Sequence, residues 1–310
     1  MRPLPPDARF VLTGPSGWIG HAMLAHLARR SGGLLAGRVI LFASAERSMS
    51  LASGECLPVR ALETIHAADV AGAHVIHLAY LTKEKAADLG ERHFTDANLA
   101  IDDAVLAALR EDGAASVFVA SSGAAQQAAR GIDLHPYGLA KLRQEARFLE
   151  WGKAAGVPVL AGRIFNIAGP HINKLEAYAV SNFALQAIRT GKITVQAAIP
   201  VFRSFLHVDD LCALVVAAGV EGTGRARPID LCGGEVVEMG DIAARVAALS
   251  GGSAVERGSI EHGRSSAYLG DFTDTRILAM ELGIDLAPLL RQIEDTIRWI
   301  ANEPDREVRA

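Results

Sequence analysis

The stretch Thr13-Gly14-Pro15-Ser16-Gly17-Trp18-Ile19-Gly20 decides the fold class of this chain. It follows a short apolar run and opens an Ala- and Leu-rich segment, so it lies where a strand turns into a helix. Glycines spaced three apart allow a tight turn, a close approach of a pyrophosphate and the packing of helix on strand. An ordinary glycine turn is the alternative, but the position after the first strand favours a dinucleotide site. We expect the contacts to come from Gly14, Ser16, Gly17, Trp18, Ile19 and Gly20.

The pattern around this turn alternates short apolar runs with longer helical segments. Strands are predicted at Arg9–Thr13, Arg38–Ala43, His74–Leu78, Ser116–Ala120 and Val157–Phe165, and helices at Trp18–Arg30, Ala86–Arg110 and Tyr137–Ala155. Such alternation is typical of βαβ units, and strands that are apolar throughout are covered by helices on both faces. We therefore expect an α/β fold with a Rossmann-type doubly wound parallel sheet.

The alternation ends beyond Gly169, which predicts a smaller C-terminal α/β substrate-binding domain. Its expected elements are a helix at 178–190, strands at 193–196 and 204–207, and a helical region that ends near residue 300. We assign residues 1–166 to the dinucleotide-binding domain, with 204–232 returning to it. Residues 167–203 and 233–310 form the substrate-binding domain.

Composition excludes several classes of protein. The 310 residues include 31 basic and 35 acidic side chains, so a basic nucleic-acid-binding footprint is absent and a small polar molecule is the expected partner. Three scattered cysteines form neither a disulfide framework nor a zinc or redox motif, so we expect no metal and a reducing, cytoplasmic location. The longest apolar stretches are about ten residues long, well short of a membrane span.

The loop after the second strand bears on the choice of cofactor. No acid stands at the strand end to take the ribose hydroxyls of NAD, whereas Ser44 and Arg47 could hold a 2′-phosphate. These residues therefore favour NADP(H) slightly over NAD(H). The alternative is that Ser44 and Arg47 are solvated loop residues and that Glu46 takes the ribose.

A serine, a tyrosine and a lysine form the candidate catalytic group. Tyr137 and Lys141 are four residues apart, hence on one face of a helix, and Ser122 lies at the carboxyl end of a central strand, where ligands of parallel sheets gather. A phenol can exchange the proton of a carbonyl, an ammonium favours the phenolate, and a hydroxyl can hydrogen-bond the reacting oxygen.

TGPSGWIG and YGLAK together resemble the extended short-chain dehydrogenase/reductases, specifically the NAD-dependent epimerase/dehydratase group that includes UDP-galactose 4-epimerase. The resemblance covers residues 9–300 and implies catalytic roles for Ser122, Tyr137 and Lys141. It also implies further cofactor-binding residues, namely Leu78, Ala79, Asn98, Tyr137, Lys141 and Ile164. Within that group, Lys141 would hold the nicotinamide ribose and Asn98 would brace the active site.

The same resemblance points to the substrate. The segment from Arg163 to Pro170 looks like the family's RxFNxxGP, whose asparagine, here Asn166, reaches a substrate phosphate. Arg203 and Arg264 fall where two arginines meet a diphosphate, a chemistry that suits the guanidinium fork. The resemblance thus implies a nucleotide-sugar substrate bound by Ser122, Asn166, Arg203 and Arg264.

Two departures from the family pattern limit the reaction. Gly123 and Ala124 stand where dehydratases carry an acidic pair, and they cannot move protons, so dehydration is disfavoured. The segment Thr194–Phe202 lacks the usual glycine-bearing turn, which predicts a reshaped nucleotide pocket.

The expected activity is NAD(P)-dependent oxidation or reduction at C4 of a nucleoside-diphosphate sugar. The alternatives are a nucleotide-sugar 4-epimerase, a reductase of a non-nucleotide carbonyl compound and a non-catalytic dinucleotide sensor. The same resemblance implies a homodimer that forms through the helices at Ala86–Arg110 and Tyr137–Ala155. Both helices carry apolar faces, although burial against their own sheet explains part of these faces equally well. The apolar residues include Ala104, Leu106, Leu109, Leu142 and Leu149.

Overall fold

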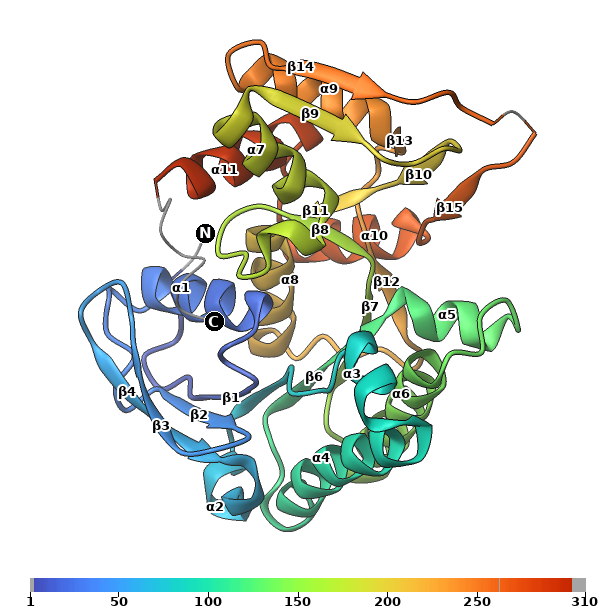
Figure 1. Cartoon of the computed structure of the whole chain (residues 1–310). Helices are drawn as coiled ribbons and strands as arrows, with labels where there is room; N and C mark the ends of the chain where they lie inside the picture. Colours follow the sequence, from blue (N-terminus) through green and yellow to red (C-terminus); the bar gives the residue numbers. More distant parts are fainter. Residues whose placement is uncertain (1–2, 262, 303–310) are drawn as a thin grey trace. The chain divides into compact units, whose positions relative to one another are not determined.

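The computed structural model describes residues 3–261 and 263–302, and its elements are labelled in Figure 1. The chain divides into two compact units. Unit 1 comprises Met1–Ile164 and Cys212–Ile229, and unit 2 comprises Phe165–Leu211 and Asp230–Ala310. The predicted C-terminal limit at residue 310 lies outside the described residues.

Unit 1 is built on a large, mostly parallel sheet. Its strands are β1 (Phe10–Thr13), β2 (Val39–Ala43), β3 (Arg47–Ser50), β4 (Cys56–Ala61), β5 (His74–His77), β6 (Ser116–Ser122) and β7 (Val159–Ile164). With β12 (Ile229–Leu231) the order is β12-β7-β6-β5-β1-β2-β4-β3, in which β3 pairs antiparallel with β4. The parallel register places Thr13 opposite His77, and His77 opposite Val119. The ends of β1 and β5 therefore lie beside each other and beside the middle of β6, which runs three residues further.

Helices cover both faces of this sheet, as its buried central strands such as β1 and β6 require (Figure 1). They are α1 (Trp18–Arg30), α2 (Ala67–Val70), α3 (Lys83–Leu89), α4 (Glu91–Asp112), α5 (Gly123–Ala129), α6 (Pro136–Ala155) and α8 (Val208–Val220), with a 3₁₀ turn at Leu62–Thr64. In Figure 1, α1 lies on one face and α2, α4 and α6 on the other. The core of this second face includes Val11, Val75 and Val117 from the strands, and Val105 and Phe148 from the helices.

Unit 2 has its own core and three small sheets. Its elements are β8 (Asn166–Ala168), a 3₁₀ turn at Leu175–Ala177, α7 (Ala179–Thr190), β9 (Lys192–Val195), β10 (Val201–Arg203), β11 (Phe205–His207), β13 (Val237–Glu238), α9 (Met239–Leu249), β14 (Ala254–Arg257), β15 (Ser266–Tyr268), α10 (Phe272–Leu282) and α11 (Leu289–Ala301). The sheets are β13-β10-β15, β11-β8 and β14-β9. Apolar side chains of α7, α9 and α11 form the core of this unit.

The predicted α/β fold with a large parallel sheet is confirmed, but two local predictions were wrong. The helix expected at Ala86–Arg110 is two helices, because Gly90 has a φ of 76°, outside the helical region. Arg47 begins β3 instead of lying in a loop.

The predicted domain boundaries also differ from the units. Residues 204–232 were assigned to the dinucleotide-binding domain, whereas Ser204–Leu211 group with unit 2. The reason is the pairing of β11, which lies parallel to β8 of unit 2 with Phe205 opposite Asn166. A short strand in the sequence does not show which sheet it joins.

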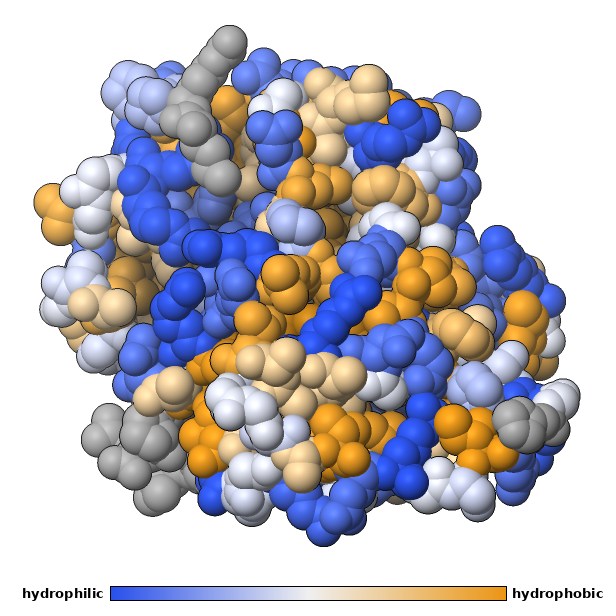
Figure 2. Space-filling model, turned by 90° about the horizontal axis from the view of Figure 1, so that it is seen from above, coloured by the Kyte–Doolittle hydropathy of each residue, from blue (hydrophilic) through white to orange (hydrophobic). Residues whose placement is uncertain are grey.

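Exposed large hydrophobic residues come from separate parts of the chain, for example Leu34, Leu134 and Met280. On the face drawn in Figure 2, hydrophobic residues lie in several groups separated by hydrophilic ones. Scattered apolar residues of this kind are normal on a folded protein.

An ion pair between Arg257 and Glu238 holds the segment before β10 in place. Arg257 donates to both carboxylate oxygens of Glu238, at 2.7 and 2.9 Å, and to the carbonyl oxygens of Ala197 and Ile199. Glu238 also accepts hydrogen bonds from the amides of Val201 and Gly240. This segment lacks a glycine-bearing turn, and the Arg257 side chain holds it instead.

We predict that Glu238→Gln lowers the free energy of unfolding at pH 7 by about 1–3 kcal/mol, the usual loss when a charged hydrogen-bond partner is removed. Burial acts to raise the pKa of Glu238, but hydrogen bonds from Arg257, Val201 and Gly240 and the charge of Arg257 outweigh it and lower that pKa to about 2. The ionised carboxylate therefore stabilises the wild type fully above the ordinary value of 4.5, and this contribution is lost as the pH falls from there toward 2.

Urea unfolding at pH 7 and pH 3 measures the difference. Glu256→Gln is the matched control, because Glu256 is an exposed carboxylate on β14 that pairs with Lys192. A loss for Glu238→Gln that is equal at both pH values, or no larger than that of the control, would contradict the prediction.

Candidate active site

The glycine turn forms a tight cradle at the carboxyl end of β1. Gly14 has a φ of 71°, and a Cβ built on it would lie 2.9 Å from the Ala79 amide nitrogen, next to the end of β5. A Cβ on Gly20 would lie 2.4 Å from the Gly14 carbonyl oxygen. Both positions therefore require glycine. At Gly20 the missing side chain leaves room for the backbone of the turn itself, whereas the sequence predicted that it leaves room for a strand. Gly17 has more space, since its Cβ would make an ordinary 3.7 Å contact.

Helix α1 begins directly after this cradle, with Trp18 buried and Ile19 half-buried in its first turn. Its N-cap is Gly17, and no side chain caps the helix. An uncapped helix N-terminus offers amide groups and a positive dipole end to an anion. The cradle and the helix N-terminus thus fit the pyrophosphate of a dinucleotide.

The exposed Arg47 side chain lies beside the same turn, because its guanidinium donates a hydrogen bond of 3.0 Å to Ser16 Oγ. Ser44 is exposed in the connection between β2 and β3. The structure brings Arg47 and Ser16 together and leaves Ser44 at the surface nearby in the chain.

The two serines at the end of β6 have different environments. Ser121 is buried and donates to Glu145, whose carboxylate also binds the Arg163 guanidinium at 2.8 and 2.7 Å. Ser122 is half-buried and accepts a hydrogen bond of 3.2 Å from the Ala124 amide. Ser121 is therefore used inside the fold, which favours Ser122 as the hydroxyl that meets a substrate.

Tyr137 lies in the first turn of α6, which starts at Pro136 after the His135 cap. The positive end of the helix dipole favours a phenolate at this position. Lys141 follows one turn later on the same helix and is buried, with 3% of its surface exposed. Helix geometry thus gives Tyr137 and Lys141 the same face of α6.

The Lys141 ammonium is held by the protein itself. It donates to the Ala120 carbonyl oxygen at 2.6 Å and to Gln144 Oε1 at 2.9 Å, and it lies 3.5 Å from the centre of the Tyr80 ring. Burial lowers the pKa of Lys141 to about 7, while the carboxylates of Asp102 and Glu145 act to raise it. Tyr80 also packs edge-on against the Tyr137 ring, with centroids 6.2 Å apart, and burial raises the pKa of its phenol.

The segment after β5 is fastened at both ends. Thr13 Oγ1 accepts hydrogen bonds from the amides of Leu78 and Ala79, and Asn98 Oδ1 accepts one from the Leu81 amide. Asn98 also donates to the Phe94 carbonyl oxygen and is only 1% exposed. The structure therefore places Asn98 as a buried brace of this segment, and its contact with the cofactor stays a prediction. Leu78 and Ala79 remain half-buried.

Three of the predicted substrate residues lie in unit 2. Asn166 donates its amide to the carbonyl oxygens of Ser204 and Tyr268. Arg203 is half-buried over the Tyr268 ring, and burial lowers its pKa. Arg264 has a side chain that is 78% exposed and lies 3.9 Å from Glu261.

The structure places the two arginines at opposite ends of the β10–β15 pair. Arg203 ends β10 opposite Tyr268, whereas Arg264 precedes Ser266, which lies opposite Val201 at the start of β10. The two side chains therefore start from opposite ends of this strand pair, and their joint contact with one diphosphate stays a prediction.

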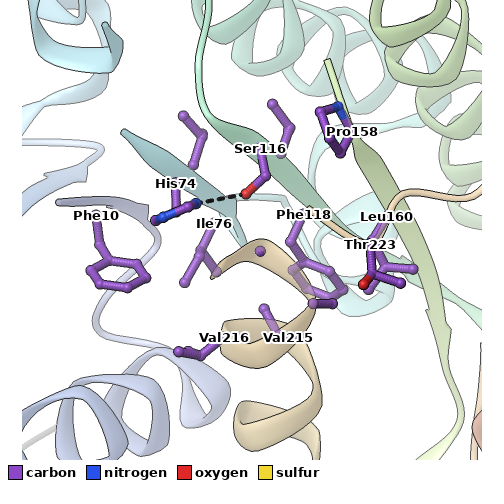
Figure 3. Close-up of a pocket in the computed structure, with 14 residues that line it drawn as sticks. Phe10, His74, Ile76, Ser116, Phe118, Pro158, Leu160, Val215, Val216 and Thr223 are labelled. Atoms are coloured by element: carbon purple, nitrogen blue, oxygen red, sulfur yellow. Dashed lines mark hydrogen bonds between the residues drawn. The ribbon is translucent and has the colours of Figure 1, made fainter. Parts of the chain in front are cut away.

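Two hollows of unit 1 lie at the amino ends of the strands, away from the glycine turn. Figure 3 shows one of about 10 Å³, lined by Phe10, His74 and Ser116 at the starts of β1, β5 and β6 and by Val215 and Val216 of α8. The other, of about 760 Å³, is lined by residues around the end of α6 and the start of β7. Ligands of parallel sheets bind at the carboxyl ends, so neither hollow is the candidate active site.

Sequence reasoning missed the side chains that surround Lys141. These are Tyr80, Asp102, Gln144 and Glu145. Gln144 and Glu145 stand three and four residues after Lys141, a helical spacing that could have indicated them. No local signal indicates Asp102 or Tyr80, because they come from other elements.

Two further observations concern the described residues. Within 3–261 and 263–302, no group of three or more His, Cys, Asp or Glu is placed to hold a metal ion. In the same part of the chain, no helix has the length and apolar character to span a membrane.

A comparison with known families gives the class of this protein. Residues 10–228 match the description "NAD dependent epimerase/dehydratase family", which covers more than two thirds of the chain. The chain therefore belongs to this family of enzymes, in agreement with the cradle and the tyrosine and lysine of α6.

Individual relatives are more distant. UDP-glucuronic acid decarboxylase 5 of Arabidopsis thaliana is 36% identical over 67 residues, which is 22% of this chain and 20% of that protein. MoeE5 in complex with UDP-glucose and NAD has a TM-score of 0.73 at 20% identity, over 96% of this chain and 100% of that one. The UDP-N-acetylglucosamine 4-epimerase of Methanobrevibacter ruminantium has a TM-score of 0.73 at 17% identity, over 98% and 100%. These two structures share the fold.

We predict that Gly14→Ala weakens NADH binding at least tenfold, equivalent to about 1.4 kcal/mol. The added Cβ would meet the backbone of Leu78 and Ala79, so the cradle must open. Gly32→Ala is the matched control, since Gly32 also has a φ of 71° but has no atom within 4 Å of the added Cβ. Fluorescence titration with NADH measures both, and equal affinity of the two variants would refute the close-approach argument.

Proposed function

We propose that this enzyme oxidises or reduces C4 of a nucleoside-diphosphate sugar. The single observation that carries the proposal is the placement of Tyr137 in the first turn of α6, one turn before the buried Lys141 ammonium. A bound nicotinamide supplies or accepts the hydride in this chemistry. The glycine cradle and the N-terminus of α1 would hold the dinucleotide.

The chain's own residues supply the acid–base part. Tyr137 takes the proton of the sugar hydroxyl during oxidation and returns it to the carbonyl oxygen during reduction. The charge of Lys141 and the helix dipole both favour the phenolate. Ser122 hydrogen-bonds the reacting oxygen and fixes its position.

The nucleotide-sugar substrate is supported by the chemistry of unit 2. Arg203 ends β10 and presents a guanidinium fork that suits phosphate oxygens. Asn166 begins β8. The names of UDP-glucose and UDP-N-acetylglucosamine in the structural relatives agree with this class of ligand. Arg264 lies before the start of β15, so it would reach the substrate from the end of the β10–β15 pair opposite to Arg203.

A nucleotide-sugar 4-epimerase is the second candidate, favoured by the fold shared with the M. ruminantium enzyme. It would use Tyr137 in both directions and return the hydride to the opposite face of the sugar. Dehydration remains disfavoured, since Gly123 and Ala124 open α5 without an acidic side chain.

The principal prediction is that Tyr137→Phe lowers kcat by at least a thousandfold while the affinity for the dinucleotide stays within about twofold. The phenylalanine keeps the ring packing against Tyr80 but cannot exchange a proton. Activity is measured on a panel of UDP-, dTDP-, GDP- and CDP-sugars with each nicotinamide cofactor. Near wild-type kcat in Tyr137→Phe would remove the mechanism.

Two further measurements separate the candidates. A reductase consumes reduced cofactor in proportion to product, whereas an epimerase interconverts sugars with no net cofactor consumption. Arg203→Ala should raise KM for the nucleotide sugar about ten- to a hundredfold with a smaller effect on kcat, because the diphosphate is held similarly in the ground and transition states. A phosphate-free carbonyl compound turned over equally by wild type and Arg203→Ala would assign the chain to another class of reductase.

We further propose that NADP(H) is the preferred cofactor, although the family is described by NAD and MoeE5 was solved with NAD. The supporting contact is the hydrogen bond from Arg47 to Ser16, which puts a guanidinium at the phosphate-binding turn. Arg47→Ala should weaken NADP(H) by about 1.5 to 3 kcal/mol, the range for hydrogen bonds to charged groups, and leave NAD(H) unchanged. Calorimetric titration of both cofactors tests this, and a wild type that prefers NAD, or equal losses for both, would overturn it.

A cytoplasmic homodimer is also proposed, with α4 and α6 at the interface. Leu106 and Leu109 are buried in the core of their own chain, so the proposal depends on the half-buried Ala104, Leu142 and Leu149. Light scattering at micromolar concentration tests it, and a monomeric mass would exclude the dimer.

A further inference from the structure

A chain of buried polar side chains connects the glycine turn to the catalytic lysine. Its five members are each at most 3% exposed and come from four different elements. They are Thr13 of β1, His77 of β5, Asp102 of α4, and Gln144 and Lys141 of α6. Buried polar groups are costly unless every one finds a partner, so the direction of each hydrogen bond can be worked out.

The first half of the chain fixes the tautomer of His77. Thr13 Oγ1 already accepts two amide hydrogens, from Leu78 and Ala79, so its own hydrogen is donated to His77 Nδ1 at 2.8 Å. Nδ1 is then an acceptor, and Nε2 carries the hydrogen. That hydrogen points at Asp102 Oδ1, 3.2 Å away.

The second half fixes the orientation of Gln144. Asp102 Oδ1 also accepts from Gln144 Nε2 at 2.6 Å, so the amide nitrogen must face Asp102 and the amide oxygen must face Lys141. A reversed amide would put two oxygens together at Asp102 and an NH₂ group against the ammonium. Asp102 thereby orients Gln144 so that the amide oxygen of Gln144 accepts a hydrogen bond from Lys141.

Lys141 thus has one acceptor for each of the three hydrogens of an ammonium. The acceptors are the Ala120 carbonyl oxygen, Gln144 Oε1 and the face of the Tyr80 ring. A neutral amine would turn its lone pair toward one of these electron-rich groups. The geometry of the site therefore matches the charged form, although burial lowers the pKa of Lys141.

We propose that Asp102, Gln144 and Tyr80 are positioning residues that hold Lys141 as a charged, immobile ammonium behind Tyr137. The inference rests on the proposed function, because it concerns the lysine that favours the Tyr137 phenolate. These contacts set the charge and position of Lys141, and its contact with the nicotinamide ribose stays a separate prediction.

The ionisable groups around Lys141 set its expected pH dependence. Asp102 on α4 and Glu145 on α6 favour the ammonium, and burial opposes it. Tyr80 supplies its ring face, Tyr137 lies on the same helix, and Arg147 lies 3.9 Å from the outer oxygen of Asp102. Removing the charge of Asp102 takes away one of the two favourable carboxylates, so Lys141 should lose its proton at lower pH.

The direct test is a titration of Lys141 by NMR on lysine-labelled protein, without substrate. The chain has only six lysines, and Lys141→Arg assigns the signal. Asp102→Asn keeps the acceptor for His77 and Gln144 but removes the charge, so we expect the pKa of Lys141 to fall by about one unit. Gln144→Leu should lower it as well. Asp103→Asn is the matched control, because Asp103 is the next residue of α4, exposed and paired with Arg147.

A second pair of variants tests the aromatic contact at a half-buried position, where folding is less at risk. Tyr80→Phe retains the ring face and should leave the pKa of Lys141 unchanged, whereas Tyr80→Leu should lower it. An unchanged pKa in Asp102→Asn, Gln144→Leu and Tyr80→Leu alike would overturn the proposal. So would an equal fall in Asp103→Asn.

Kinetics add a readout that loss of stability would not produce. In Asp102→Asn, kcat/KM should be close to wild type at pH 5.5 and about tenfold lower at pH 8, because a one-unit fall in the pKa of Lys141 reduces the ammonium fraction about tenfold there. A loss that is equal at both pH values would contradict the positioning role. If no nucleotide sugar is turned over at all, the proposed function fails. The titration still tests whether Asp102, Gln144 and Tyr80 hold Lys141 as an ammonium.

Discussion

The burial of the Lys141 ammonium is the constraint on which the organisation of unit 1 depends. A charge with 3% of its surface exposed must be compensated by dipoles or counter-charges inside the fold. The Ala120 carbonyl at the end of β6, the amide of Gln144 and the Tyr80 ring meet this need directly. Asp102 orients Gln144, and His77 and Thr13 complete the hydrogen bonds of Asp102.

The same contacts connect the glycine cradle after β1 to Lys141 of α6. Thr13 precedes the glycine cradle and binds the amides of Leu78 and Ala79, against which Gly14 packs. The parallel register of β1, β5 and β6 makes this possible, because it brings Thr13, His77 and Val119 side by side. A displacement of any one strand end would disturb both the cradle and the network that reaches Lys141. Buried and fully partnered polar networks of this kind specify one arrangement.

Unit 2 also uses charged side chains to hold backbone groups in place. The segment before β10 has no glycine-bearing turn, and the Arg257–Glu238 pair fastens it by bonding both side chains to backbone groups. Arg203 at the end of β10 is half-buried against Tyr268, which limits the directions its guanidinium can take.

Sequence alone determined the class of fold, the glycine turn after β1 and the tyrosine–lysine pair, because each depends on local spacing: glycines three apart after a strand, and a phenol and an ammonium four apart on a helix. Only the tertiary structure decided which side chains surround that pair. Asp102 and Tyr80 come from α4 and from the segment after β5, and their proximity to Lys141 follows from how helices pack on the sheet. Local sequence patterns likewise did not indicate three further features. These are the helix break at Gly90, the pairing of β11 with β8 in unit 2, and the placement of Arg264 and Arg203 at opposite ends of the β10–β15 pair. Backbone conformation at one glycine and the choice of pairing partner are set by contacts between residues far apart in the chain, which no spacing rule contains.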